Sequence, residues 1–184
     1  MQIRSGRLKG RELFYPRSGL RPTKDITRQA IFNIIGPHIR NARILDLFAG
    51  GGALGIEALS RGAKEAVFVD NNPGVLKLLR ANVKGLADIP GIENTRVMKR
   101  DAAQAIRRLK RQMFDIVFAD PPYRQDHVQA TLDQCLRLDV VKPGGILIIE
   151  HHRLETPDRL EGWELLKHGK YGDSEVTVVR RLDE

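Results

Sequence analysis

The stretch that decides the fold runs from Arg43 to Gly55 and reads RILDLFAGGGALG. The apolar residues of 44–47 predict a short buried strand, and a glycine-rich loop follows it. Apolar residues then recur at helical spacing until Gly62, which is typical of a helix C-terminus. The next apolar run, residues 66–69, ends at Asp70. This order predicts a βαβ unit, the building block of a parallel α/β sheet.

The glycines of the loop raise the question of which cofactor it would bind. Gly50, Gly52 and Gly55 satisfy the pattern G-x-G-x-x-G, which by itself also fits a nicotinamide dinucleotide. Asp46 argues against a dinucleotide, because a carboxylate would repel the pyrophosphate that such a loop holds. S-adenosylmethionine has no phosphate and carries an ammonium and a sulfonium. Asp70 is placed to accept hydrogen bonds from its ribose hydroxyls, so we expect S-adenosylmethionine.

A second motif, Asp120-Pro121-Pro122-Tyr123, follows the apolar run 114–119. The two prolines end the predicted strand, because neither offers a backbone N–H to a sheet. They leave a carboxylate, rigid carbonyls and an aromatic ring at the carboxyl end of a strand, where α/β sheets bind ligands. This combination suits the recognition of a planar base by its exocyclic amine. The alternative is a proline-rich turn with a tyrosine in the core.

The motifs together resemble the motif series of the class I methyltransferases. The series comprises Asp46-x-Phe48-x-Gly50-x-Gly52, Asp70, Asp101-Ala102 and Asp120-Pro121-Pro122-Tyr123. More closely, the chain resembles the bacterial small-subunit (16S) ribosomal RNA guanine-N2 methyltransferases. That likeness rests on residues 3–11, 20–23, 28–33, 52–62 and 171–174.

The resemblance implies a fold and a cofactor site. The fold is an α/β, Rossmann-like class I methyltransferase sheet, mostly parallel with a C-terminal antiparallel strand. The implied cofactor is S-adenosyl-L-methionine, with Asp46 facing its cationic end, Asp70 its ribose, and Asp101 with the Ala102 amide its adenine. The expected cofactor-binding residues are Asp46, Phe48, Ala49, Gly50, Gly52, Asp70, Asn71, Asp101, Ala102 and Asp120.

The expected catalytic residues are Asp120, Pro121, Pro122 and Tyr123. The exocyclic amine of guanine is a poor nucleophile, because its lone pair is delocalised into the ring. The Asp120 carboxylate and the Pro121 carbonyl are expected to accept its two N–H groups and orient the nitrogen. Tyr123 is expected to stack on a base displaced from its neighbours. Alignment then supplies most of the acceleration.

The N-terminal residues predict a separate element. Residues 1–20 alternate polar and apolar around two glycines, which predicts a basic β-hairpin extension that binds RNA, and residues 21–184 form the methyltransferase domain. The expected RNA-binding residues are Arg4, Arg7, Lys9, Arg11 and Arg21. The alternative for this cluster is a solvated edge. Near the other end, residues 164–167 and 176–179 predict an antiparallel pair that closes the sheet.

The composition points to a polyanionic partner. Lys and Arg number 31 against 23 Asp and Glu, a net charge of +8, which favours RNA. With the resemblance, we expect 16S rRNA within a small-subunit ribosomal particle. Cys135 is the only cysteine, and adjacent His151 and His152 would point to opposite faces of a strand, so we expect no metal. No apolar run reaches membrane length, and we expect a cytoplasmic monomer.

Other functions fit parts of the same pattern. A DNA amino-methyltransferase acting on adenine or cytosine uses the same Asp-Pro-Pro-Tyr motif, but such enzymes usually carry a sizeable target-recognition domain for which 184 residues leave no room. A nicotinamide oxidoreductase is the second alternative. A non-catalytic RNA-binding assembly factor is the third, and the intact Asp46, Asp70 and Asp120 argue against it.

Overall fold

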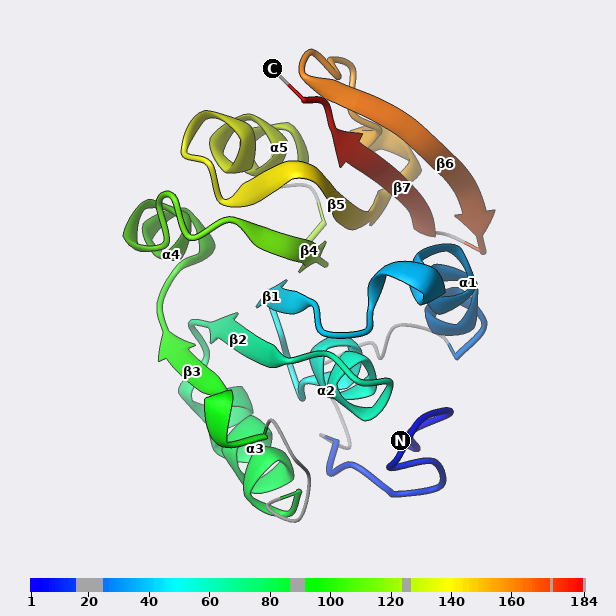
Figure 1. Cartoon of the computed structure of the whole chain (residues 1–184), viewed down its shortest axis with the longest axis vertical. Helices are drawn as coiled ribbons and strands as arrows, with labels where there is room; N and C mark the ends of the chain where they lie inside the picture. The colour runs from blue at the N-terminus through cyan, green and yellow to red at the C-terminus, as the bar shows by residue number, and fades with distance from the viewer. Residues whose placement is uncertain (16–24, 87–91, 124–126, 173, 184) are drawn as a thin grey trace.

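The computed structural model describes residues 1–184 except 16–24, 87–91, 124–126, 173 and 184 (Figure 1). Within the described residues, seven strands form one sheet in the order β3-β2-β1-β4-β5-β7-β6. The strands are β1 (Arg43–Leu47), β2 (Glu65–Asp70), β3 (Arg96–Lys99), β4 (Phe114–Ala119), β5 (Val141–His152), β6 (Trp163–Tyr171) and β7 (Ser174–Arg181). The helices are α1 (Asp25–Ile35), α2 (Ala53–Ser60), α3 (Pro73–Lys84), α4 (Ala102–Arg108) and α5 (His127–Arg137), with short 3-10 helices at Gly36–His38, Ile92–Asn94 and Arg153–Glu155.

The sheet is parallel from β3 to β5, and β7 runs antiparallel to both β5 and β6. The predicted α/β class and the predicted C-terminal antiparallel pair are therefore confirmed. The continuous apolar run at Ile146–Ile149 in β5 is buried along its whole length. Such a run is expected for a strand that is covered on both faces.

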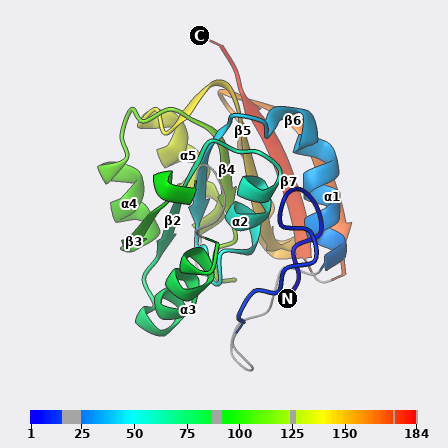
Figure 2. The ribbon, with the colours of Figure 1, turned by 60° about the horizontal axis from the view of Figure 1, so that its bottom comes forward.

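Two apolar cores lie on the two faces of the sheet (Figures 1 and 2). On one face, α1, α2 and α3 pack on alternate strand residues such as Ile44, Phe68 and Phe118. On the other face, α4 and α5 pack on the intervening residues, such as Leu45 and Val117. The two-residue alternation of a strand thus sends neighbouring side chains to different cores. Among the described residues, no helix combines the length and apolarity that crossing a bilayer requires.

The predicted N-terminal β-hairpin is wrong. The described N-terminal residues, 1–15, form a turn-rich loop with one isolated antiparallel bridge, between Gln2 and Glu12. Several of its amides bond to α2 instead of to a second strand: the amides of Arg7 and Leu8 donate to the Ser60 carbonyl and hydroxyl at 2.8 and 3.0 Å.

Burial explains why this loop does not form a free hairpin. Ile3, Leu8 and Leu13 are all buried in the core on the α2 side of the sheet. Gly6 has a φ of +81°, and a Cβ there would lie 1.9 Å from the Ser60 carbonyl oxygen. Only glycine permits this close approach. The polar–apolar alternation in this segment therefore reflects docking onto α2.

Candidate functional site

The site lies where the chain changes direction across the sheet. β1 and β4 are parallel neighbours, with Leu47 opposite Ala119. From β1 the chain continues to β2 on one side, and from β4 it continues to β5 on the other. Ligands of open α/β sheets bind outside the carboxyl ends of the strands at such a switch point. Asp46 near the end of β1 and Asp120 just after β4 therefore lie at the edge of the sheet where this crevice is expected.

The glycine loop follows β1 and leads into α2. Phe48, Gly50 and Gly52 all have positive φ values, of 59°, 55° and 86°. The Ala49 amide donates to the Val69 carbonyl at 2.9 Å, which holds the loop to the end of β2. The Phe48 ring is half-buried, with its centroid 5.8 Å from that of the His127 ring. The loop backbone is therefore folded sharply and closely held at the crevice.

Asp46 is a buried carboxylate at the base of this loop. Its Oδ2 accepts a hydrogen bond from the Gly55 amide at 2.9 Å. A Cβ at Gly55 would lie 2.3 Å from the Phe68 ring and 3.1 Å from Asp46 Oδ2, which explains the third glycine of the pattern. Burial, with a smaller contribution from the Asp70 carboxylate and against the lowering effect of the Gly55 amide, raises the pKa of Asp46 to about 8. Such a site favours a cationic ligand.

Asp70 ends β2 and bonds to the glycine loop. Its Oδ2 accepts from the Gly50 amide at 3.0 Å, and its Oδ1 accepts from the Asn72 amide at 2.8 Å. A carboxylate has about four lone-pair sites, so both oxygens keep acceptor capacity. Asn71, the next residue, is exposed. The carboxylate thus orders the loop and can still accept hydroxyl groups.

Asp101 and Ala102 lie after β3, on the same edge. The Arg100 amide donates to the Asp70 carbonyl at 3.1 Å, which brings this segment beside the end of β2. Asp101 is exposed and caps α4, since its Oδ1 accepts from the Ala103 and Gln104 amides at 2.9 and 3.3 Å. The capping holds the buried Ala102 at the first position of the helix.

The motif of residues 120–123 follows β4, as predicted. Asp120 is half-buried, Pro121 is buried and Pro122 is exposed. The Tyr123 hydroxyl lies 2.6 Å from the Ser174 hydroxyl at the start of β7. The Tyr123 ring lies 5.8 Å, between centroids, from the ring of His152 at the end of β5. The C-terminal strands therefore hold Tyr123 in place.

Tyr15 also reaches the glycine loop, and sequence reasoning missed it. A Cβ at Gly51 would lie 3.1 Å from Tyr15 Cε2, so the phenol ring packs against the loop backbone. Burial, together with the Asp120 and Asp46 carboxylates, raises the pKa of Tyr15 to about 12. The phenol therefore lies near both acids. Nothing in the sequence around Phe14 and Tyr15 indicates that the second of these two aromatic residues would contact the loop.

The basic residues expected to bind RNA lie mostly on the N-terminal loop. The side chains of Arg4, Arg7, Lys9 and Arg11 are exposed, and Arg11 Nη1 donates to the Gly85 carbonyl at 2.8 Å. Arg21 lies outside the described residues, as does the predicted boundary between residues 20 and 21. Arg28 in α1 is buried and donates to the Gln2 carbonyl at 2.8 Å, which ties α1 to the N-terminal loop.

Comparison with known proteins finds a family model and several relatives that match most of the chain. The family model "Conserved hypothetical protein 95" matches residues 1–180. The chain is 34% identical to "Putative rRNA methyltransferase YlbH" of Bacillus subtilis over 98% of this chain and 99% of that protein. It is 32% identical to "Ribosomal RNA small subunit methyltransferase D" of Haemophilus influenzae over 94% of this chain and 89% of that protein.

A solved structure shows the same fold over the full length. It is described as "Putative methyltransferase yhhF from Escherichia coli", and it superposes with a TM-score of 0.89. The sequences are 31% identical, and the match covers 100% of this chain and 99% of that one. The chain therefore belongs to the Conserved hypothetical protein 95 family, the family of the ribosomal RNA small subunit methyltransferases D.

Proposed function

We propose that this protein is an S-adenosylmethionine-dependent methyltransferase that methylates the exocyclic N2 amine of a guanine in 16S ribosomal RNA. One observation carries the proposal. The Asp120-Pro121-Pro122-Tyr123 segment stands at the switch point of the sheet, beside a glycine loop bordered by Asp46 and Asp70. Family membership adds the substrate class, because the relatives are named for small-subunit ribosomal RNA.

The residues at the crevice fit S-adenosylmethionine. Asp46 is buried, and its raised pKa means that a neighbouring cation would favour its ionised form. The ammonium and sulfonium of this cofactor supply that charge. A nicotinamide dinucleotide would instead bring a pyrophosphate toward the Asp70 carboxylate, which would repel it, and toward Asp46, whose ionised form an anion would disfavour further. The acidic side chains of Asp46 and Asp70 therefore favour S-adenosylmethionine over a nicotinamide dinucleotide.

The proposed contacts follow the strand ends in order. Asp46 faces the cationic end, together with the backbone of Phe48, Ala49, Gly50 and Gly52. Asp70 accepts from the ribose hydroxyls with the acceptor capacity that its bonds to Gly50 and Asn72 leave, and Asn71 lies next to it. The segment Asp101-Ala102, held by the α4 cap, contacts the adenine. When bound, S-adenosylmethionine supplies an electrophilic methyl group.

The chain's own part in catalysis is to orient the amine. The Asp120 carboxylate and the Pro121 carbonyl accept its two N–H groups, which aligns the nitrogen lone pair with the methyl group. The buried Pro121 and the exposed Pro122 stiffen the backbone that presents them. Tyr123, held by Ser174 and by the ring of His152, stacks on the displaced guanine. Positioning of this kind supplies a large share of the rate.

The N-terminal loop is the proposed RNA contact. Arg4, Arg7, Lys9 and Arg11 present four exposed cations on a segment that also carries Tyr15 to the glycine loop. A contact here would place the RNA next to the crevice. We therefore propose residues 1–20 as the RNA-binding extension and residues 21–184 as the catalytic domain, with a small-subunit particle as the partner.

The substrate class is tested by methyl transfer from labelled S-adenosylmethionine. The purified protein is incubated with four acceptors: small ribosomal subunits that lack the modification, naked 16S rRNA, 23S rRNA and DNA. We expect label in 16S rRNA, from the subunit or the naked form. Label in DNA would support the amino-methyltransferase of DNA instead. No label in any acceptor, with S-adenosylmethionine bound, would support the non-catalytic assembly factor.

A further inference from the structure

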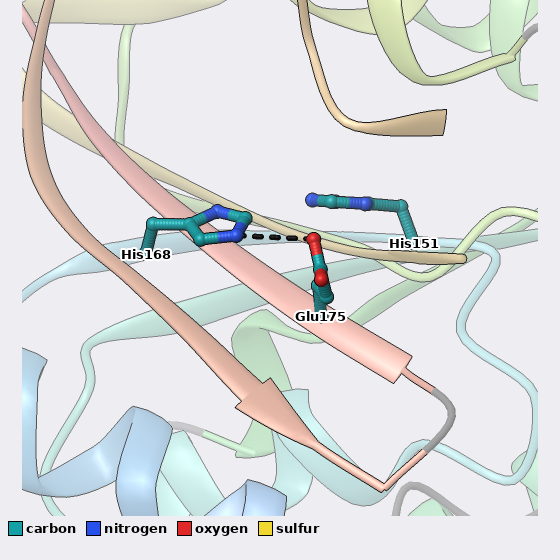
Figure 3. A group of neighbouring side chains, drawn as sticks. All are labelled: His151, His168 and Glu175. Atoms are coloured by element: carbon teal, nitrogen blue, oxygen red, sulfur yellow. Dashed lines mark ion pairs between the residues drawn. The ribbon is translucent and has the colours of Figure 1, made fainter. Parts of the chain in front are cut away.

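Three polar side chains from the C-terminal strands converge away from the glycine loop. His151 is on β5, His168 on β6 and Glu175 on β7, and His151 pairs in register with Glu175 (Figure 3). One potential ligand atom from each lies within 4.8 Å of the other two. His152 is adjacent to His151 in the sequence, but neighbouring side chains of a strand point to opposite faces. The partner of His151 is instead His168, which the β-sheet brings close from the next-but-one strand.

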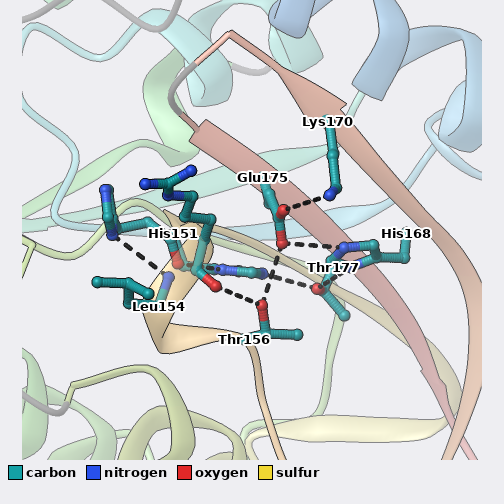
Figure 4. A network of polar contacts seen from close by, with 9 residues as sticks. His151, Leu154, Thr156, His168, Lys170, Glu175 and Thr177 are labelled. Atoms are coloured by element: carbon teal, nitrogen blue, oxygen red, sulfur yellow. Dashed lines mark hydrogen bonds and ion pairs between the residues drawn. The ribbon is translucent and has the colours of Figure 1, made fainter.

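The hydrogen bonds of His151 define its protonation. Its Nδ1 lies 3.0 Å from the His152 carbonyl oxygen, an acceptor, so Nδ1 carries the hydrogen. Its Nε2 therefore presents a lone pair, 2.8 Å from the Thr177 hydroxyl (Figure 4).

The two ring nitrogens of His168 face two different partners, Thr177 and Glu175. Thr177 has one hydroxyl hydrogen, which it gives to His151 Nε2. His168 Nδ1, 3.0 Å from the same hydroxyl oxygen, must then carry a hydrogen and donate it. Its other nitrogen, Nε2, lies 3.0 Å from the carboxylate oxygen Oε2 of Glu175. A positive species, either a proton or a metal ion, can bridge an imidazole nitrogen and a carboxylate oxygen at this distance.

We propose that His151, His168 and Glu175 form a binding site for a divalent transition-metal ion of the Zn²⁺ type. Two imidazole nitrogens and one carboxylate oxygen form a ligand set that such ions prefer. The distance of 3.0 Å between His168 Nε2 and Glu175 Oε2 is close to the separation of two ligands on one ion. The proposal stands independently of the proposed methyl transfer.

The surroundings also match a metal site, because each ligand has a partner that orients it. His151 Nδ1 donates to the His152 carbonyl, His168 Nδ1 contacts the Thr177 hydroxyl, and the Glu175 Oε2 accepts from Thr156 at 3.0 Å (Figure 4). Outer partners of this kind fix the tautomer and direction of metal ligands. An ion would take the His151 Nε2 lone pair, and the Thr177 hydroxyl would turn its hydrogen away.

Access and charge are compatible with an ion. The His168 side chain is 30% exposed, which opens the cluster to solvent, whereas the Glu175 side chain is only 7% exposed. Lys170 lies 3.6 Å from Glu175 Oε1, but its side chain is 79% exposed. An ion pair with so exposed a lysine contributes little and can be displaced.

Zinc titration of the metal-free protein tests the site. The full chain is stripped with a chelator, and ZnCl₂ is added in competition with a chromophoric chelator. We expect one zinc per chain, and a melting temperature that rises with zinc. His168→Gln and Glu175→Gln should each weaken zinc binding by at least about tenfold. His38→Gln, which changes an exposed histidine on the 3-10 helix Gly36–His38, should bind zinc like the wild type.

Two results would overturn the proposal. One is zinc binding that is absent in the wild type or equal in the wild type and His168→Gln, with circular dichroism showing that both are folded. The other comes from side-chain ¹⁵N NMR in the presence of one equivalent of zinc. If both ring nitrogens of His168 still carry hydrogens, a proton occupies the position that the metal was expected to take.

Discussion

The carboxyl group of Asp46 links the fold to the proposed chemistry at the scale of single residues. It is buried at the base of the glycine loop, and one backbone amide is its hydrogen-bond donor. The places of Asp46, Asp70 and Asp120 at strand ends could be predicted from the sequence, because each lies at or near the end of an apolar run that predicts a strand. Tyr15 could not, because its contact with Gly51 joins segments about 35 residues apart.

Asp46→Asn should change the pH dependence of stability. The pKa of Asp46 rises from 3.8 to about 8 on folding. Between these values the folded chain holds a proton that the unfolded chain has lost, so the free energy of unfolding falls as the pH rises. The asparagine side chain of the variant binds no proton in the folded or the unfolded state. Its stability relative to wild type should increase with pH by up to about 1.4 kcal/mol per pH unit, and should level off above about pH 8.

Urea unfolding of both proteins from pH 5 to pH 9 measures this difference. Asp158→Asn, at a side chain that is 81% exposed, is the control and should show a nearly constant difference. A stability difference for Asp46→Asn that is also independent of pH would show that Asp46 is ionised in the folded protein throughout.

Tyr15→Ala should weaken S-adenosylmethionine binding by about 1 kcal/mol, because the ring that packs on the glycine loop is lost. Tyr15→Phe should bind nearly as the wild type does, since packing needs the ring. Phe14→Ala removes a neighbouring aromatic ring that is 66% exposed and serves as the matched control. Calorimetric titration gives the affinities. Equal affinities for Tyr15→Ala and Phe14→Ala would place Tyr15 outside the cofactor site.

Asp120→Ala should keep the fold and most of the cofactor affinity but lose methyl transfer. The carboxylate orients one amine, and misplacement by about 1 Å can lower a rate about a hundredfold. Asp120→Asn should be milder, because its amide oxygen still accepts a hydrogen bond. Single-turnover rates at saturating cofactor and RNA separate these variants. A rate for Asp120→Ala above about a third of the wild-type rate would contradict the orienting role.

At the scale of elements, hydrophobic periodicity predicted the main strands and helices. It did not predict the conformation of the N-terminal segment. The β1–α2–β2 unit and the β6–β7 pair form at the predicted places. In the N-terminal loop, alternation was interpreted as strand pairing, but Ile3 and Leu8 pack against the α2 side of the core. Periodicity reports that a residue is buried, and cannot by itself tell which neighbour buries it.

Replacing Arg4, Arg7, Lys9 and Arg11 with glutamine should weaken RNA binding and flatten its salt dependence. Each lost phosphate contact should reduce the log–log slope by about one. The matched control removes the same charge from exposed residues on and just after α4, on the opposite face of the sheet: Arg107, Arg108, Lys110 and Arg111. Filter binding across a salt series compares the two variants. Equal slopes for both would mean that the N-terminal cations add only net charge.

At the scale of the whole molecule, the seven-stranded sheet of the described residues carries two groups of polar side chains, one on each half. Its parallel half presents the carboxylates of Asp46, Asp70 and Asp120. Its antiparallel half holds Tyr123 through Ser174 and His152, next to the cluster of His151, His168 and Glu175. The cluster could not be predicted, because only the register of β5, β7 and β6 brings these residues together. The net charge of +8 fits a polyanionic partner.

The identity of the methylated nucleoside is the decisive test of the proposed guanine-N2 methylation. Small ribosomal subunits that lack the modification are incubated with the protein and S-adenosylmethionine, and the 16S rRNA is digested and analysed by mass spectrometry. We expect N2-methylguanosine at one position with the wild type, and none with the Asp120→Ala variant. A methyl group on a ring nitrogen or on ribose, or N2-methylguanosine formed equally by Asp120→Ala, would contradict it.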